Sequence, residues 1–191
     1  MITSFDQLDP NKVYTFQDYR SWQFEDRVEL HRGYVVRLFP VPNRKHQLIS
    51  SRIHGKLFIH LQDSDACEVY SAPFDVRLST GDAEGDTVVQ PDLCVTCDPD
   101  KLTIQGCTGA PDLIVEILSP HDIRHDLRDK FSLYEAAGVP EYWIVDPRSD
   151  YVIRYNLNDE NKFIGSEPYF AEDTIVSQQL PGFRLDLHQI F

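Results

Sequence analysis

The sequence holds one carboxylate where an apolar side chain would be expected. Glu116 lies within residues 112–118, an Asp-Leu-Ile-Val-Glu-Ile-Leu segment that is typical of a strand buried on both faces. Alternation along the strand places Glu116 on the same face as Ile114 and Leu118. An ionised carboxylate at such a position costs several kcal/mol unless a cation or hydrogen-bond donors compensate it. We therefore expect a positive partner beside Glu116, supplied either by the cation of a salt bridge or by a metal ion.

Two further carboxylates could converge on Glu116. Asp92 follows Pro91 at the start of a predicted strand, and Glu29 is the single acid of a basic segment. Adjacent carboxylates raise one another's pKa unless a divalent cation keeps them ionised, and an all-oxygen ligand set suits Mg²⁺ or Mn²⁺. We predict metal ligands at Asp92, Glu116 and Glu29. The alternatives are a turn or cap aspartate at position 92 and a surface or paired glutamate at position 29.

A lysine could approach these carboxylates from a helix. The pattern over residues 123–137 predicts a helix in which Lys130 shares one face with Phe131 and Tyr134. This face points toward the sheet, so the Lys130 ammonium would need a buried acceptor. The alternative is an exposed ion pair with Asp126, one turn earlier.

Charge is distributed unevenly along the chain. The net charge is −13, from 18 basic and 31 acidic residues, which argues against a protein that coats nucleic acid or an anionic membrane. Residues 27–56, however, contain seven basic residues and one acid. This segment is either a solvated surface or a face that holds a polyanion. The candidate phosphate-contacting residues are Arg32, Arg44, Lys45, His46 and Arg52.

The elements that must position these residues form a mixed α/β protein with helices beside the sheet. The length of 191 residues favours a single domain. We divide it into an N-terminal helical arm (1–26), a core (27–150) and C-terminal strands (151–191). The predicted elements are a strand pair over 28–39, a helix over 46–61, two strands within 67–78, and strands at 88–95, 112–118, 141–146 and 151–156.

Four cysteines and the N-terminal composition bear on the cellular compartment. The sequence has no run approaching the roughly 18 apolar residues of a membrane span, and its N-terminus lacks a secretory pattern. We predict a cytoplasmic protein without a membrane partner, whose cysteines (Cys67, Cys94, Cys97 and Cys107) stay reduced. The Cys94–Cys97 spacing matches half of a zinc knuckle, but no second pair follows, so core cysteines are favoured.

Several motifs together carry a resemblance to a known family. They are Arg27–Gly33 (RVELHRG), Arg44–Gln47, Ala72–Val76, Val89–Leu93, Gly109–Pro120 (GAPDLIVEILSP), Asp126–Tyr134 and Gly138–Pro147 (GVPEYWIVDP). This series resembles the Uma-two family, whose members are regarded as restriction endonucleases within the PD-(D/E)XK nuclease superfamily. The similarity runs from about residue 12 to the end of the chain. The motifs around Glu116 and Trp143 are specific, whereas a single Pro-Asp pair is not.

The resemblance implies a restriction-endonuclease-like fold, with a mixed central sheet flanked by helices and a divalent-metal site at one end. By position, Asp92 resembles the metal-binding Asp, Glu116 the acid of the D/E-x-K strand, and Glu29 the N-terminal acid. The superfamily's lysine usually lies two residues after that acid, where this chain has Leu118. Lys130 would have to replace it from the following helix. A rival Pro111–Asp112 pair lies at the entry end of the Glu116 strand, so we favour Asp92.

Three functions follow as hypotheses. The first is Mg²⁺- or Mn²⁺-dependent hydrolysis of duplex DNA, with Asp92, Glu116 and Lys130 as catalytic residues; two-strand cleavage would suit a homodimer. The second is a catalytically weak or inactive nuclease-fold module that binds nucleic acid or a protein partner. The third is hydrolysis of a small phosphoester.

Overall fold

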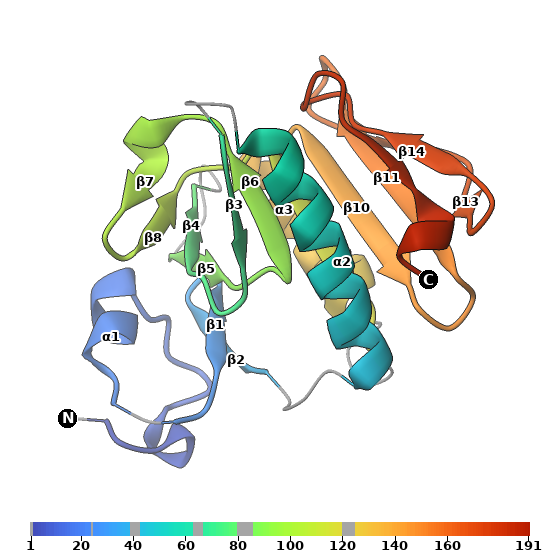
Figure 1. The fold of residues 1–191 in the computed structure, drawn as a ribbon. Coiled ribbons are helices and arrows are strands. Elements are labelled where there is room, and N and C mark those ends of the chain that lie inside the picture. Colours follow the sequence, from blue (N-terminus) through green and yellow to red (C-terminus); the bar gives the residue numbers. More distant parts are fainter. Residues whose placement is uncertain (1, 24, 39–42, 63–66, 80–85, 120–124) are drawn as a thin grey trace.

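The structure is a computed structural model that describes residues 2–23, 25–38, 43–62, 67–79, 86–119 and 125–191, without the side chains of residues 125–127. Its core is a mixed sheet in the order β12-β11-β10-β9-β6-β3, with β13 also paired to β11. These strands are β3 (Glu68–Ser71), β6 (Leu93–Thr96), β9 (Leu113–Ile117), β10 (Glu141–Asp146), β11 (Tyr151–Leu157), β12 (Phe163–Gly165) and β13 (Tyr169–Phe170). Figure 1 shows how this sheet crosses the middle of the molecule.

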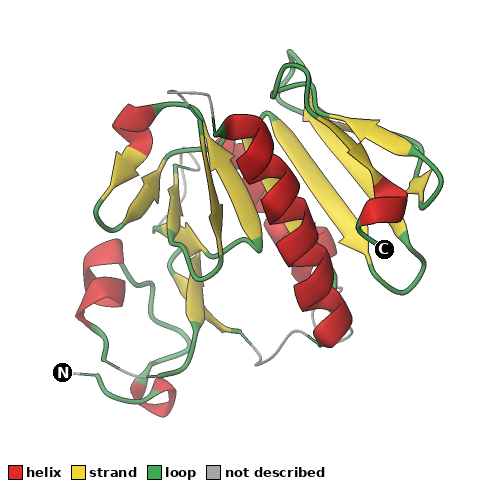
Figure 2. Cartoon of the chain, in the orientation of Figure 1, coloured by secondary structure: helices red, strands yellow, loops and turns green. Residues whose placement is uncertain are grey.

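A second sheet lies beside the first. Its order is β2-β1-β5-β4-β8-β7. The strands are β1 (Val28–His31), β2 (Tyr34–Arg37), β4 (Val76–Leu78), β5 (Thr87–Val89), β7 (Leu102–Thr103) and β8 (Gly106–Thr108). A separate hairpin pairs β14 (Thr174–Val176) with β15 (Arg184–Asp186), and Figure 2 shows the strands of all three sheets in yellow.

The predicted central strand is confirmed as β9. Every residue of β9 is buried, and the strand pairs in parallel with β10 and antiparallel with β6. The strand is apolar on both faces because each face is covered by other elements. The mixed character of the predicted sheet is thereby confirmed.

Helices cover opposite faces of this central sheet. Helix α2 (Arg44–Leu61) packs Ile49, Ile53 and Leu57 on the face that carries Val115. Helix α3 (Phe131–Ala137) packs Leu133 and Tyr134 on the opposite face, which carries Ile114. Figure 1 shows α2 crossing in front of the sheet and α3 behind it. None of the helices within the described ranges combines the length and the apolar character that a membrane crossing requires.

Helix α3 is preceded by a π-helical turn that carries Lys130. This turn, η3, spans His125–Lys130 and continues directly into α3. The helix ends at Gly138, whose left-handed backbone (φ 78°) lets its amide cap the carbonyl groups of Tyr134 and Glu135. Residues 123 and 124 of the predicted helix lie outside the described residues.

The N-terminal arm is tied to the second sheet. It contains η1 (Phe5–Gln7) and α1 (Phe16–Ser21), and α1 has a capping box between Thr15 and Asp18. The Phe16 amide donates to Asp86 Oδ2 over 2.7 Å, and Arg77 donates to Asp86 Oδ1. The division into arm, core and C-terminal strands stays a prediction.

The prediction of four reduced cysteines is wrong for this structure. Cys67 and Cys97 form a disulfide, whereas Cys94 and Cys107 are free and buried. Strand β3 pairs with β6 in a register that places Glu68 opposite Thr96, so Cys67 and Cys97 form the next cross-strand pair. The expected cellular compartment did not predict this disulfide, because it says nothing of which cysteines the strand register places opposite each other. The Cys94–Cys97 pair is not arranged as half of a zinc site, since Cys97 is bonded to Cys67 and Cys94 is a free, buried cysteine.

Candidate active site

Lys130 lies between two buried carboxylates. Its Nζ is 2.9 Å from Glu116 Oε1 and 3.2 Å from Glu29 Oε1. Lys130 is 4% exposed, Glu116 3% and Glu29 0%. The two carboxylates come from different sheets, since Glu116 is on β9 and Glu29 is on β1. The positive partner expected beside Glu116 is therefore Lys130. The alternative of an exposed lysine is wrong because Lys130 is buried, and the side chain of Asp126 lies outside the described residues.

Glu29 is held by groups of its own sheet. Its Oε1 accepts a hydrogen bond from the Gln90 amide over 2.7 Å, and its Oε2 lies 2.8 Å from His31 Nε2. His31 is two residues after Glu29 on β1 and therefore projects from the same face. Gln90 follows β5, which pairs with β1. These contacts fix Glu29 toward Lys130 rather than toward solvent.

Glu116 has a second donor from helix α3. The Tyr134 hydroxyl donates to Glu116 Oε1 over 2.6 Å, and Tyr134 is fully buried. Burial raises the pKa of Tyr134 well above its usual 10, and the negative charges of Glu116 and Glu29 raise it further. Tyr134 thus stays a neutral hydrogen-bond donor at any physiological pH.

Asp92 lies at the start of β6, opposite Glu116. The register pairs Leu93 with Val115, so position 92 is the next partner of position 116. Asp92 Oδ2 accepts from the Ile117 amide over 2.8 Å and lies 3.2 Å from His46 Nε2. Because the ionised carboxylate can only accept, the proton of this contact belongs to Nε2.

The carboxylates differ in how well they fit a divalent cation. Glu29 is fully buried, and Lys130, His31 and Gln90 surround its oxygens. Asp92 retains a side-chain exposure of 22% and lies one register position beyond the Leu93–Val115 pair, opposite residue 116. No group of three His, Cys, Asp or Glu side chains arranged around one metal position occurs within the described part of the chain. Asp92 and Glu116 supply carboxylate oxygens from neighbouring strands, and hard oxygen ligands of this kind are what Mg²⁺ or Mn²⁺ prefers.

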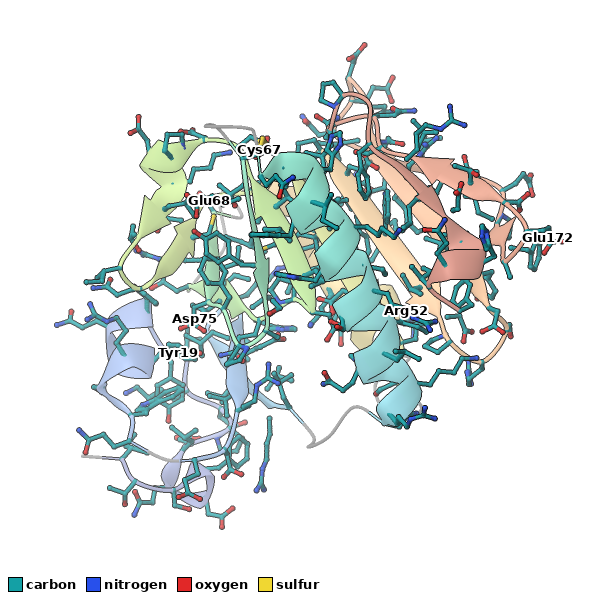
Figure 3. The ribbon with its side chains drawn as sticks, viewed as in Figure 1. Tyr19, Arg52, Cys67, Glu68, Asp75 and Glu172 are labelled. Carbon is teal, nitrogen blue, oxygen red and sulfur yellow. A yellow bond between two sulfur atoms is a disulfide. The ribbon has the colours of Figure 1, made fainter. Side chains whose placement is uncertain are left out.

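The five basic candidates do not form one cluster. Lys45 pairs with Asp150 over 2.7 Å, and His46 is buried against Asp92. Arg52 donates to the backbone oxygens of residues 190 and 191, and Figure 3 labels it on α2. Arg32 and Arg44 are exposed, and the described residues provide neither with an ion pair.

Three residues of the site were missed as functional candidates in the sequence. His31 could have been found by alternation from Glu29, and Tyr134 by its place on the Lys130 face. Gln90 had no such signal, because its role depends on the pairing of β5 with β1.

Known proteins share this architecture. A crystal structure titled as "a putative nuclease belonging to DUF820 from Anabaena variabilis" superposes with a TM-score of 0.69 at 17% identity, covering 87% of this chain and 90% of that one. An uncharacterized protein of Synechocystis sp. is 29% identical over 152 residues, which are 78% of this chain and 76% of the relative. The model of the Uma2 family, described as "Putative restriction endonuclease", matches residues 16–188. The chain therefore belongs to the Uma2 family, as its motifs indicated.

Proposed function

We propose that this protein is a divalent-metal-dependent endonuclease that hydrolyses phosphodiester bonds of duplex DNA. The observation that carries the proposal is the position of Lys130, whose ammonium is buried 2.9 Å from Glu116. Asp92 is opposite residue 116 in the register, one position beyond the Leu93–Val115 pair on the adjacent strand. A buried lysine held between two carboxylates is the kind of charged cluster that is concentrated at functional sites. The family match and the nuclease-like fold support the same activity.

Asp92 and Glu116 are the proposed ligands of Mg²⁺ or Mn²⁺, and Glu29 serves as a third acid that holds Lys130. When bound, the cation polarises a phosphate oxygen and lowers the pKa of a water molecule. Lys130 orients the attacking water and stabilises negative charge that develops on the phosphate. Tyr134 and Glu29 position Lys130 and Glu116, and His46 positions Asp92.

Binding of the DNA backbone is assigned to the basic face around β1, β2 and the start of α2. Arg32 and Arg44 are exposed and contact phosphates directly in this proposal. Lys45 can exchange Asp150 for a phosphate, because both side chains of this pair are more than 40% exposed. His46 and Arg52 already contact Asp92 and the backbone oxygens of residues 190 and 191, so they support this face from the same helix without contacting phosphates. A homodimer in the cytoplasm would place one active site on each strand of the DNA duplex.

The test is cleavage of supercoiled plasmid with Mg²⁺ or Mn²⁺ and with chelator. We compare the wild type with Asp92→Asn, Glu116→Gln and Lys130→Met, and use Asp159→Asn and Lys162→Met as exposed controls with the same charge changes. Each site variant should lose about 100-fold or more in rate, whereas the controls should stay within about twofold. Thermal unfolding of each variant shows which ones are folded. Asp92→Asn is the most informative variant because Asp92 is partly exposed.

Unchanged cleavage in all three site variants would refute the assignment. Tight DNA binding without metal-dependent cleavage would instead indicate the second hypothesis, an inactive nuclease-fold module that binds nucleic acid. Turnover of an aryl phosphodiester without cleavage of duplex DNA would select hydrolysis of a small phosphoester.

A further inference from the structure

A separate cavity lies beside the proposed active site. It has a volume of about 300 Å³ and is lined by two chain segments and Gln90. One segment precedes β4 and contributes Pro73, Phe74 and Asp75, and the other is the β7–β8 turn, residues 103–106. Gln90 joins the cavity to the site, because its side-chain amide donates to Asp75 Oδ1 while its backbone amide donates to Glu29 Oε1.

The cavity offers a hydrogen-bond acceptor that is held in place. Asp75 Oδ1 accepts from the Tyr19 hydroxyl over 3.0 Å and from Gln90 Nε2 over 2.8 Å. Figure 3 shows Tyr19 of the N-terminal arm next to Asp75. Arg27 donates to Gln90 Oε1, so the amide group of Gln90 cannot turn without losing these contacts. An acceptor fixed in this way selects ligands that present N–H groups.

The cavity also has a planar aromatic wall. Phe74 stacks on Tyr70 with ring centroids 4.1 Å apart and planes within 5°. This stack fixes the Phe74 ring, which leaves a rigid surface on the cavity. Aromatic rings of this kind bind unpaired nucleobases by stacking.

The β7–β8 turn forms the remaining wall. Gly106 has a φ of 133°, and a Cβ there would lie 2.1 Å from the Asp75 carbonyl oxygen. Glycine therefore allows the turn to lie directly against Asp75. Ile104 at the tip is 99% exposed, and the Gln105 side chain makes no hydrogen bond with the described residues. An apolar tip of this type can fill the gap that an extruded base leaves in a stack.

We infer that this cavity binds one unpaired nucleobase that carries an exocyclic amino group, next to the phosphate that the active site cleaves. The inference rests on the proposed action on DNA. Phe74 stacks on the base, Asp75 accepts from its amino group, and Gln105 is a positioning residue at the opening. Cytosine, adenine and guanine present such an amino group. Thymine presents its single N3–H only between two carbonyl oxygens, which the Asp75 carboxylate repels.

The test measures binding of fluorescent single-stranded oligonucleotides of deoxycytidine or of thymidine in the presence of chelator, so that no cleavage occurs. The wild type should prefer the deoxycytidine probe by roughly tenfold. Asp75→Asn should abolish this preference, because an amide can also donate to thymine. This variant should remain folded, since the amide oxygen that replaces the carboxylate can still accept from Tyr19 and Gln90. Phe74→Leu should weaken the binding of both probes by roughly tenfold, because the base loses its stacking partner.

Asp159→Asn is the matched control, because it removes the same charge at an exposed position outside the cavity and should keep the preference. Equal affinity of the wild type for both probes, or an unchanged preference in Asp75→Asn, would overturn the inference. Plasmid cleavage is measured separately on the same variants. Cleavage without base preference refutes only the base site, and base preference without cleavage refutes only the nuclease activity.

Discussion

Lys130 follows Glu116 by fourteen residues, and its ammonium nitrogen nevertheless lies 2.9 Å from the Glu116 carboxylate. Strand β9 ends at Ile117, and Lys130 is the last residue of the π-helical turn η3, which continues into α3 on the face of the sheet that carries Ile114. This path explains how a chain with Leu118 at the usual lysine position still brings an amine to Glu116. The pair is buried, so its removal should affect both stability and activity.

Lys130→Met should lower the free energy of unfolding by about 3–5 kcal/mol, because it leaves Glu116 and Glu29 buried without their cation. The double variant Glu116→Gln/Lys130→Met should lose less than the sum of the two single variants. Urea unfolding measures both effects. The control Lys162→Met, which removes an exposed pair with Glu135, should cost less than about 1 kcal/mol. Additive losses in the double variant would contradict the coupling.

Tyr134→Phe should cost about 1.5–3 kcal/mol at pH 8, since it removes a hydrogen bond to a charged group. The pKa of Tyr134 is raised above 10 in the folded protein, so this tyrosine stabilises the fold fully below pH 10. Above pH 10 the unfolded chain loses the tyrosine proton first, and the stabilisation decreases. Urea unfolding at pH 8 and above pH 10 should therefore show that the difference between wild type and Tyr134→Phe narrows. A constant difference would be inconsistent with this account.

The Phe16 amide should report the titration of Asp86. Burial alone would raise the pKa of Asp86, but hydrogen bonds from Phe16 and Arg77 outweigh it and lower the pKa below its usual 3.8. The stabilisation is present above pH 3.8 and is lost as the pH falls through the lower folded value. The NMR shift of the Phe16 amide should follow this transition, and Asp86→Asn should abolish it. A midpoint above 3.8 would contradict the prediction.

Two of the four cysteines should react with a thiol reagent in the denatured, unreduced protein. Cys67 and Cys97 are joined across 30 residues, while Cys94 and Cys107 are free. Reduction should lower stability by roughly 3–4 kcal/mol according to the size of the loop. Cys67→Ala should reproduce this loss and make the protein insensitive to reductant. Four reactive thiols before reduction would show that the disulfide is absent.

Arg44→Ala and Arg52→Ala should separate DNA binding from folding. Arg44 is exposed, so its removal should weaken DNA binding and reduce the salt dependence of binding by about one phosphate contact, without a change in thermal stability. Arg52 binds the backbone of residues 190 and 191, so its removal should destabilise the protein by about 1–2 kcal/mol. Fluorescence anisotropy over a salt series and thermal unfolding measure the two effects. Equal salt dependence in wild type and Arg44→Ala would exclude a phosphate contact at Arg44.

Local periodicity predicted much of the site. Alternation identified Glu116 as a buried carboxylate, and helix spacing turned Lys130 toward the sheet; both are where these patterns placed them. The burial of a further carboxylate, Glu141, was not predicted. This carboxylate accepts from Trp143, Ser177 and two backbone amides, and so fixes the C-terminal segment. Its strand position gave no signal, because most of these donors come from residues more than 30 positions away.

Contacts between distant segments were beyond the reach of the sequence patterns. Glu29 contacts Lys130 although β1 and β9 belong to different sheets, and no local spacing encodes such a contact. The β7–β8 turn was not predicted, since its two- and three-residue strands are too short for a periodic pattern. The disulfide likewise depends on the register of β3 against β6.

The contact of Lys130 with carboxylates on both sheets has a consequence for how the molecule unfolds. If the two sheets separated, Lys130 would lose either Glu29 or Glu116. The carboxylate left behind would then stay buried without its cation, or the core of each sheet would have to open to water. Neither sheet can therefore detach at low cost while the other stays intact. The two sheets are thus expected to unfold together in one cooperative transition, even though each sheet has its own hydrogen-bond network.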